Sequence, residues 1–171
     1  MNARAYTLAR SEKERRTAIT SGAGGAICMT NLPPAMIAHP PIDVRWVRGV
    51  AFEAGRPQGP KIAIDGDAQT APSPFDVLLA AVASCAAVDV VTILEKQRTP
   101  VRALEVRIEA QRVDATPRRL ASAVLHFAIT APGTTIEKAK RAVELSVTKY
   151  CSVRSSLLAD AAVSWQVELH P

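Results

Sequence analysis

Aromatic residues are scarce in this chain, and features that mark several specialised classes of protein are missing. Phe, Trp and Tyr make up 4% of the residues, so a hydrophobic core has to be built from Ala, Val, Leu and Ile. The first thirty residues contain no apolar segment of the kind found in a signal peptide. The longest uncharged apolar run, Val77 to Val88, has 12 residues, whereas a membrane span needs about 20. We therefore expect a cytoplasmic protein that has no membrane partner.

Cysteines are also few. Cys28, Cys85 and Cys151 are too far apart for the disulfide framework of a small secreted domain. The sequence has no Cys-x-x-Cys motif and no His at metal-ligand spacing from a Cys, so we expect no metal site. In a reducing compartment, widely spaced cysteines are either small core residues or redox-active thiols.

Positive charge is present but is concentrated at one end. Of the net charge of +5, residues 1–35 contribute +3, from five basic and two acidic side chains. The remaining residues are close to neutral and contain no basic stripe interleaved with aromatics. We therefore expect no nucleic-acid partner.

The chain is long enough for one domain with a lead segment. Residues 1–42 show no sustained hydrophobic period and include a proline cluster, so we predict a mobile lead in which residues 1–35 and Cys28 are dispensable. A short helix over residues 5–16 would have no apolar stripe to bury. Residues 43–171 then form the folded domain.

Hydrophobic periodicity within residues 43–171 predicts an α+β fold. Alternation from Val44 to Phe52, followed by a second strand over residues 61–65, predicts a hairpin or the start of a meander. Two further alternating segments, 104–111 and 121–129, predict an antiparallel pair, and residues 163–169 predict a last strand. Strands and helices are therefore segregated along the chain.

Two helices are predicted from their start signals. Ser73 has the character of an N-cap with Pro74 in the first helical position, and the helix should run to about Gln97 as an apolar, buried central helix. Thr134 and Glu137 have capping-box spacing and predict a second helix. A short turn of helix is expected to begin at Cys151.

Taken one at a time, the two domain cysteines differ in how well they suit chemistry. Cys85 lies deep inside the apolar helix, where a cysteine is usually a small core residue, and Asp89 one turn later would raise its pKa. Cys151 lies at a helix start with Arg154 following, an environment that favours a thiolate. On this basis Cys151 is the better activated thiol.

Together, the segments around the two cysteines resemble a family. The sequence Ser-Pro-Phe-Asp-Val-Leu-Leu-Ala-Ala-Val-Ala-Ser-Cys, residues 73–85, is similar to the central-helix motif of OsmC/Ohr proteins. Lys-Tyr-Cys-Ser-Val-Arg-Ser-Ser-Leu, residues 149–157, resembles the second-cysteine motif of the same family. The resemblance covers about residues 43–170 and includes the order of strands and helices.

The resemblance implies an intertwined homodimer that reduces organic hydroperoxides. Cys85 would be the peroxidatic cysteine and Cys151 the resolving one, with an external dithiol as reductant and no bound cofactor. Arg56, which follows Gly55, matches the family's activating arginine, and Asp76 stands near the position of its acidic partner.

Several alternatives remain open at this point. Arg56 is equally well explained as a solvated loop charge, and Asp76 as a helix-start charge. The peroxidase branch has Glu directly after the proline, where this chain has Phe75, and a proline after the second cysteine, where this chain has Ser152. These departures resemble a less understood OsmC-like branch. A redox-sensing or ligand-binding homodimer without peroxidase activity, or a dimer module with inert thiols, is therefore also consistent with the sequence.

Three further residues have simple structural explanations. Trp46 and Trp165 are expected in the strand core. His126 falls on the strand face opposite its apolar neighbours, so we expect a surface or interface residue rather than a catalytic base.

Overall fold

The computed structural model describes residues 36–170, and residues 40–171 form one compact unit. The expected helix at residues 5–16, Cys28 and the predicted dispensability of residues 1–35 all lie outside the described residues. The fold is α+β, as predicted. In chain order the elements are β1 (Asp43–Arg48), β2 (Ala51–Gly55), β3 (Lys61–Asp65), α1 (Pro74–Lys96), β4 (Ala103–Arg112), β5 (Leu120–Thr130), α2 (Ile136–Leu145), the π-helical turn η1 (Ser146–Tyr150), α3 (Ser152–Ser155) and β6 (Ala162–His170).

The first sheet contains one strand more than the sequence pattern predicted. The alternation from Val44 to Phe52 is divided by a tight turn, because Gly49 adopts a φ of 48°, a value that glycine reaches without a steric penalty. The result is an antiparallel meander in the order β1-β2-β3. Trp46, expected in the core, is 63% exposed in the single chain, so that expectation was wrong.

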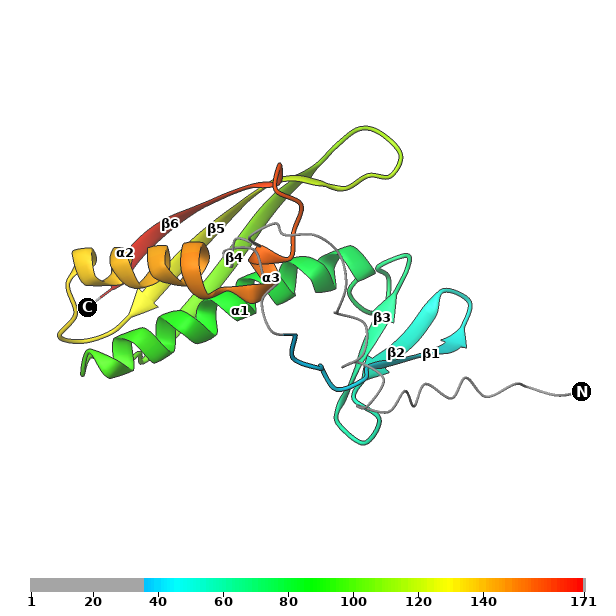
Figure 1. Cartoon of the computed structure of the whole chain (residues 1–171), viewed down its shortest axis with the longest axis horizontal. Helices are drawn as coiled ribbons and strands as arrows, with labels where there is room; N and C mark the ends of the chain where they lie inside the picture. Colours follow the sequence, from blue (N-terminus) through cyan, green and yellow to red (C-terminus); the bar gives the residue numbers. More distant parts are fainter. Residues whose placement is uncertain (1–35, 171) are drawn as a thin grey trace, which may run out of the picture. The chain divides into compact units, whose positions relative to one another are not determined.

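Helix α1 begins as the sequence predicted (Figure 1). The Ser73 side chain accepts from the Asp76 N–H, and the Asp76 carboxylate accepts from the Ser73 N–H, so both halves of the capping box are present. By length and composition alone α1 could cross a membrane. In the fold it packs against β4, α2, η1 and α3.

Not every side of α1 is covered, which corrects the expectation of a helix buried all round. Its fully buried residues lie on one side, whereas Val88 is 65% exposed. An apolar helix face left in solvent is costly, because about 25 cal/mol is lost per Å² of apolar surface not buried. The uncovered face is therefore a candidate interface.

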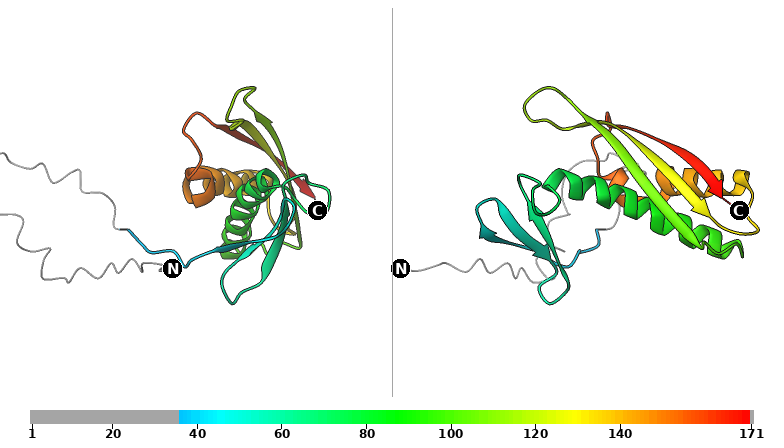
Figure 2. Two further views of the ribbon diagram at one scale, coloured as in Figure 1. Left: turned by 90° about the vertical axis from the view of Figure 1, so that its right-hand side faces the viewer. Right: turned by 180° about the vertical axis from the view of Figure 1, so that it is seen from behind.

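The second sheet has the order β4-β5-β6 (Figure 2). β4 and β5 pair antiparallel, as predicted, with Val106 opposite Phe127. β6 lies parallel to β5, because the long connection through α2, η1 and α3 returns the chain to the end at which β5 began. His126 lies on the sheet face opposite its apolar neighbours but is half-buried. Its Nε2 is itself buried, has no hydrogen-bond partner among the described residues and lies 3.9 Å from a Glu109 oxygen, so the expectation of a surface residue holds only in part.

The segment from α2 to α3 changes its helical form at the point where it meets α1. The N-cap of α2 is Thr135, one residue later than the capping-box spacing predicted. The chain then continues from α2 into η1 without a break, and the Cys151 N–H closes the wider π turn by donating to the Ser146 carbonyl at 2.8 Å. Such turns are rare and occur often at functional sites.

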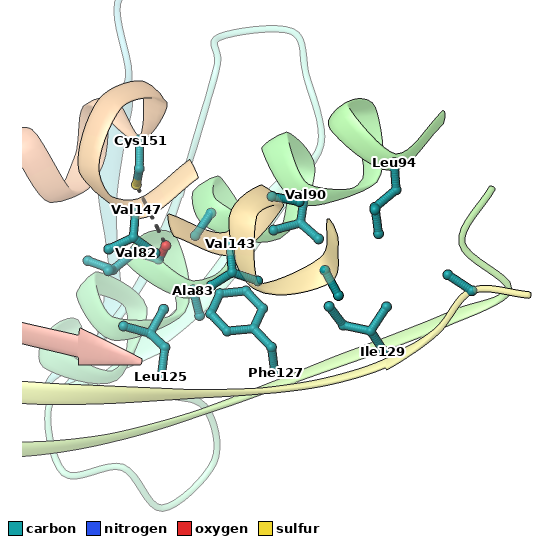
Figure 3. Packing of buried hydrophobic residues seen from close by; sticks show 14 residues of the cluster. Val82, Ala83, Val90, Leu94, Leu125, Phe127, Ile129, Val143, Val147 and Cys151 are labelled. Atoms are coloured by element: carbon teal, nitrogen blue, oxygen red, sulfur yellow. Dashed lines mark hydrogen bonds between the residues drawn. The ribbon is translucent and has the colours of Figure 1, made fainter. Parts of the chain in front are cut away.

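The main core lies between the second sheet and the helices α1 and α2 (Figure 3). Phe127, Leu125 and Ile129 of β5 are almost completely buried against residues of α1 and α2. Trp165 of β6 packs partly buried on this cluster, as expected. Cys151 is one of the buried members of the core, so the core itself fixes one of the two thiols.

Candidate functional site

The structure brings Cys85 and Cys151 together from segments far apart in the chain. Cys85 is in the middle of α1 and is partly exposed. Its Sγ lies 4.0 Å from the Ser152 Oγ, at the first residue of α3. Both cysteines are free thiols.

Cys151 is held more tightly than Cys85. It is only 1% exposed, and it caps α3 by accepting the Arg154 backbone N–H on its Sγ at 3.3 Å. Its Sγ also contacts the Val82 carbonyl oxygen of α1 at 3.9 Å, the dashed line in Figure 3. These contacts orient the Cys151 sulfur toward α1, one turn before Cys85.

The Cys85 thiol is activated by neutral dipoles. Partial burial alone would raise its pKa, because burial disfavours the thiolate. Hydrogen bonds from the Val153 N–H, the Cys151 thiol and the hydroxyl and N–H of Ser152 outweigh this effect, so the pKa of Cys85 lies below its ordinary value. A larger fraction of Cys85 is therefore nucleophilic thiolate at neutral pH.

Cys151 has the opposite shift. Burial, the hydrogen bond to Cys85 and the negative charges of Cys85 and Asp89 raise the pKa of Cys151 to about 11, and the Arg154 N–H opposes them only in part. The expectation that Cys151 is the better activated thiol was therefore wrong. Arg154 was expected to favour the Cys151 thiolate through its positive charge, but it contacts the sulfur through its backbone N–H.

Arg56 and Asp76 are placed elsewhere in the single chain. Arg56 is exposed in the loop between β2 and β3, where its carbonyl accepts from the Lys61 ammonium group. Asp76 is bound to Ser73 at the start of α1, and the hydrogen bonds from Ser73 hold the pKa of its carboxyl below the usual range. The groups that lower the pKa of Cys85 most do not include Arg56.

Sequence reasoning missed two serines at this site. Ser152 was noted only as a departure from a proline, yet it lies against the Cys85 sulfur. Ser146, completely buried, donates its hydroxyl to the Ala86 carbonyl at 2.8 Å. Ser146 carries no sequence signal, because the π turn that turns it toward α1 has no recognisable motif.

An apolar groove of about 650 Å³ runs along α1 on the side that faces β4. Ser84, the neighbour of Cys85, lines it together with the exposed Val88 and with Leu104 and Val106 of β4. Cys85 itself does not line the groove. Within residues 36–170, no three His, Cys, Asp or Glu side chains are grouped closely enough to hold a metal ion.

Comparison with known protein families shows which family the chain belongs to. Residues 65–167 match the family described as OsmC-like protein, a span that covers more than half of the chain. The chain belongs to the OsmC-like family.

Individual relatives agree with the family assignment. Protein YhfA of Escherichia coli (strain K12) is 38% identical over 122 residues, which are 71% of this OsmC-like chain and 90% of the relative. An OsmC-like protein from Mycoplasma pneumoniae has a TM-score of 0.69 at 16% identity, over 80% of this chain and 100% of that one. The organic hydroperoxide resistance protein OhrB of Bacillus subtilis has a TM-score of 0.53 at 15% identity, over 75% and 96%. The last two similarities show the shared OsmC-like fold alone.

Proposed function

We propose that the protein reduces organic hydroperoxides with Cys85 as the peroxidatic cysteine and Cys151 as the resolving cysteine, in defence against oxidative stress. One observation carries the proposal: the fold brings a partly exposed thiol in the middle of α1 into hydrogen-bonding contact with a fully buried second thiol at the start of α3. A nucleophile and a protected second thiol are what a two-step thiol peroxidase requires. The test is dithiol-dependent hydroperoxide consumption by the wild type and by a variant at each sulfur.

In the first step the Cys85 thiolate attacks the terminal oxygen of the hydroperoxide. The S–O bond forms as the O–O bond breaks, so Cys85 becomes a sulfenic acid and the peroxide becomes an alkoxide that takes a proton to leave as alcohol. Ser152 and the Val153 N–H stabilise the thiolate before attack. We assign Arg56 the positive charge that stabilises the leaving alkoxide, with Asp76 as its acidic partner; both roles require a second chain.

In the second step Cys151 attacks the Cys85 sulfur and displaces hydroxide, which leaves as water, to form a disulfide. The charge state of Cys85 determines when Cys151 becomes reactive. While Cys85 is a thiolate, its charge and hydrogen bond help to keep Cys151 protonated and unreactive. Oxidation of Cys85 to a neutral sulfenic acid removes that effect, so the pKa of Cys151 falls when its thiolate is needed.

An external dithiol completes the cycle by thiol–disulfide exchange, with no bound cofactor. Two thiol groups of the reductant become a disulfide as Cys85 and Cys151 return to thiols. Such a cycle suits the cytoplasm, where dithiol reductants are kept reduced. We therefore propose a cytoplasmic enzyme.

Replacing Ser152 with alanine tests the activating hydroxyl. We expect the apparent pKa of Cys85, read from the pH dependence of its alkylation by iodoacetamide, to rise by about half a unit to one unit, the scale of one lost hydrogen bond. Ser155→Ala is the matched control, because Ser155 is an exposed serine on the same short helix. Identical profiles for Ser152→Ala and wild type would contradict the activating role.

We also propose that the active form is a homodimer. By strand register, Val44, Trp46 and Ile62 share one face of the first sheet, and each is more than half exposed. Val88 on α1 is equally exposed beside the apolar groove. Apolar surface distributed over two elements favours a partner with the same two surfaces, which a second copy of the chain provides.

A charge placed in the groove should break the dimer. We expect Val88→Asp to shift the mass measured by light scattering at micromolar concentration from dimer to monomer, because a buried unpaired carboxylate is strongly unfavourable at an interface. Ala115→Asp adds the same charge in the exposed turn between β4 and β5 and should leave the dimer intact. A wild-type monomer at this concentration would contradict the proposal.

The second candidate function is a redox-sensing or ligand-binding homodimer without peroxidase turnover. It is favoured by one observation, the dipolar rather than cationic surroundings of Cys85 in the single chain. The same thiol pair would then form a disulfide reversibly, but would not consume peroxide catalytically. The apolar groove between α1 and β4 would offer such a domain a site for an apolar ligand.

A further inference from the structure

Ser146 is a completely buried polar residue at the contact between η1 and α1. Its neighbours Val143 and Val147 belong to the apolar core. A hydroxyl in such surroundings is unfavourable unless it is hydrogen-bonded. The Ser146 hydroxyl is bonded to the Ala86 carbonyl at 2.8 Å, and Ala86 directly follows Cys85 on α1.

The backbone of the same residue is bonded to the other cysteine. The Ser146 carbonyl accepts the Cys151 N–H at 2.8 Å, the bond that closes the π turn. An ordinary α-helical bond would pair this N–H with residue 147, one position later. Ser146 therefore contacts the residue after Cys85 through its side chain and Cys151 itself through its main chain.

A second contact supports the same docking. The Cys151 sulfur meets the Val82 carbonyl at 3.9 Å, one helical turn before Ala86. The turn is thus attached to two carbonyl groups of α1 that flank Cys85 in the sequence. Of the two contacts, the Ser146 bond is shorter and uses the stronger donor, so it is the firmer attachment.

We propose that Ser146 is a positioning residue for the thiol pair, whose hydroxyl fixes η1 on α1 and thereby holds Cys151 and Ser152 against Cys85. It does not touch the reacting sulfur atoms, and its role as part of a catalytic site rests on the proposed function. If the Ser146 hydroxyl only met its own need for a hydrogen bond in the core, its removal would change the stability of the fold alone. A serine that positions the pair also affects the ionisation of Cys85 and the rate at which the two sulfurs join.

The test compares Ser146→Ala with wild type in the full chain, without peroxide. The Ala86 carbonyl keeps its place in the hydrogen-bond ladder of α1, so the substitution leaves no buried acceptor without a donor. We expect alkylation of Cys85 at pH 7 to slow by about threefold or more, with its pH profile displaced to higher pH. Disulfide formation driven by the azo oxidant diamide, which takes up two electrons and two protons from the thiol pair, should slow by a similar factor.

Thr148→Val is the matched control. Thr148 is in the same π turn, and its hydroxyl donates to the Glu144 carbonyl at 2.7 Å, within the same helical segment. This variant loses a side-chain to backbone hydrogen bond of the same turn that is exposed and does not reach α1, so we expect wild-type alkylation and wild-type disulfide formation.

Ser146→Thr keeps the hydroxyl but adds a methyl group to the buried space, and so separates the bond from the packing. We expect its melting temperature to fall while the ionisation of Cys85 stays as in wild type. The inference is overturned if Ser146→Ala lowers the melting temperature but leaves the alkylation of Cys85 and disulfide formation at their wild-type rates. It is also overturned if Ser146→Thr folds but shows a raised apparent pKa of Cys85. If the wild type does not consume hydroperoxide, the proposed function is wrong, but alkylation and diamide-driven disulfide formation still test the positioning role of Ser146.

Discussion

Replacing Cys85 with serine should reduce dithiol-dependent hydroperoxide consumption to the uncatalysed rate. A serine hydroxyl has no accessible anion at neutral pH, and Cys151 cannot substitute because it is 1% exposed and its burial, the largest cause of its raised pKa, persists in the variant. The measurement is the loss of an organic hydroperoxide such as cumene hydroperoxide, supplied with dithiothreitol and compared with wild type. The activity of the wild type should rise with pH as Cys85 ionises and level off below the ordinary thiol range, because the pKa of Cys85 is lowered.

Cys151→Ser is the matched control for this variant. It keeps the attacking thiolate and loses the second sulfur, so we expect one equivalent of peroxide to be consumed rapidly and the Cys85 sulfenic acid to accumulate. Dimedone, which alkylates sulfenic acids, would label the Cys85 peptide in mass spectrometry. Substantial turnover by Cys85→Ser would sink the assignment of the nucleophile. A wild type that forms the disulfide but does not turn over would favour the redox-sensing alternative.

Replacing Arg56 with alanine should lower hydroperoxide turnover by about 10²-fold, the scale of losing one charge-stabilising donor at a developing anion. The physical reason is that the hydrogen bonds around Cys85 favour its thiolate, whereas the leaving alkoxide needs a positive charge of its own. The loop that carries Arg56 connects β2 and β3 and is fixed by Lys61 on the Arg56 carbonyl, so the substitution leaves that contact in place. The measurement is kcat/KM for the hydroperoxide.

Arg118→Ala is the control for Arg56→Ala. Arg118 is exposed in the turn between β4 and β5, and its removal changes the net charge by the same amount. We expect it to leave kcat/KM unchanged. If Arg56→Ala also turns over at the wild-type rate, the neutral donors at Ser152 and Val153 account for the activation by themselves, and the role of Arg56 is confined to the loop.

Local rules in the sequence were sufficient to predict most of the secondary structure. Ser73, Pro74 and Asp76 predicted the start of α1 to the residue, because capping depends on neighbours in sequence. Strict alternation predicted β4 and β5 and their antiparallel pairing. The turn at Gly49 was missed because the apolar alternation runs through it on both sides, so the period alone does not reveal the break.

For the candidate site, too, some features could be predicted from the sequence and others could not. The sequence determined by itself that Cys85 lies within an apolar helix and Cys151 at a helix start, and the resemblance around both identified the family. Which thiol is activated was decided only by tertiary structure. Hydrogen bonds and burial set a thiol's pKa, and the donors to Cys85 come from residues 151–153, distant in the chain.

The uncovered apolar surfaces and the contacts of Ser146 were also decided only by tertiary structure. Trp46 and Val88 are apolar in the sequence and were expected inside, but exposure depends on what else packs against them. Ser146 became a contact between the two thiol segments because the π turn changes the helical register by one residue just before Cys151. A register change of this kind depends on packing against α1, which no local pattern encodes.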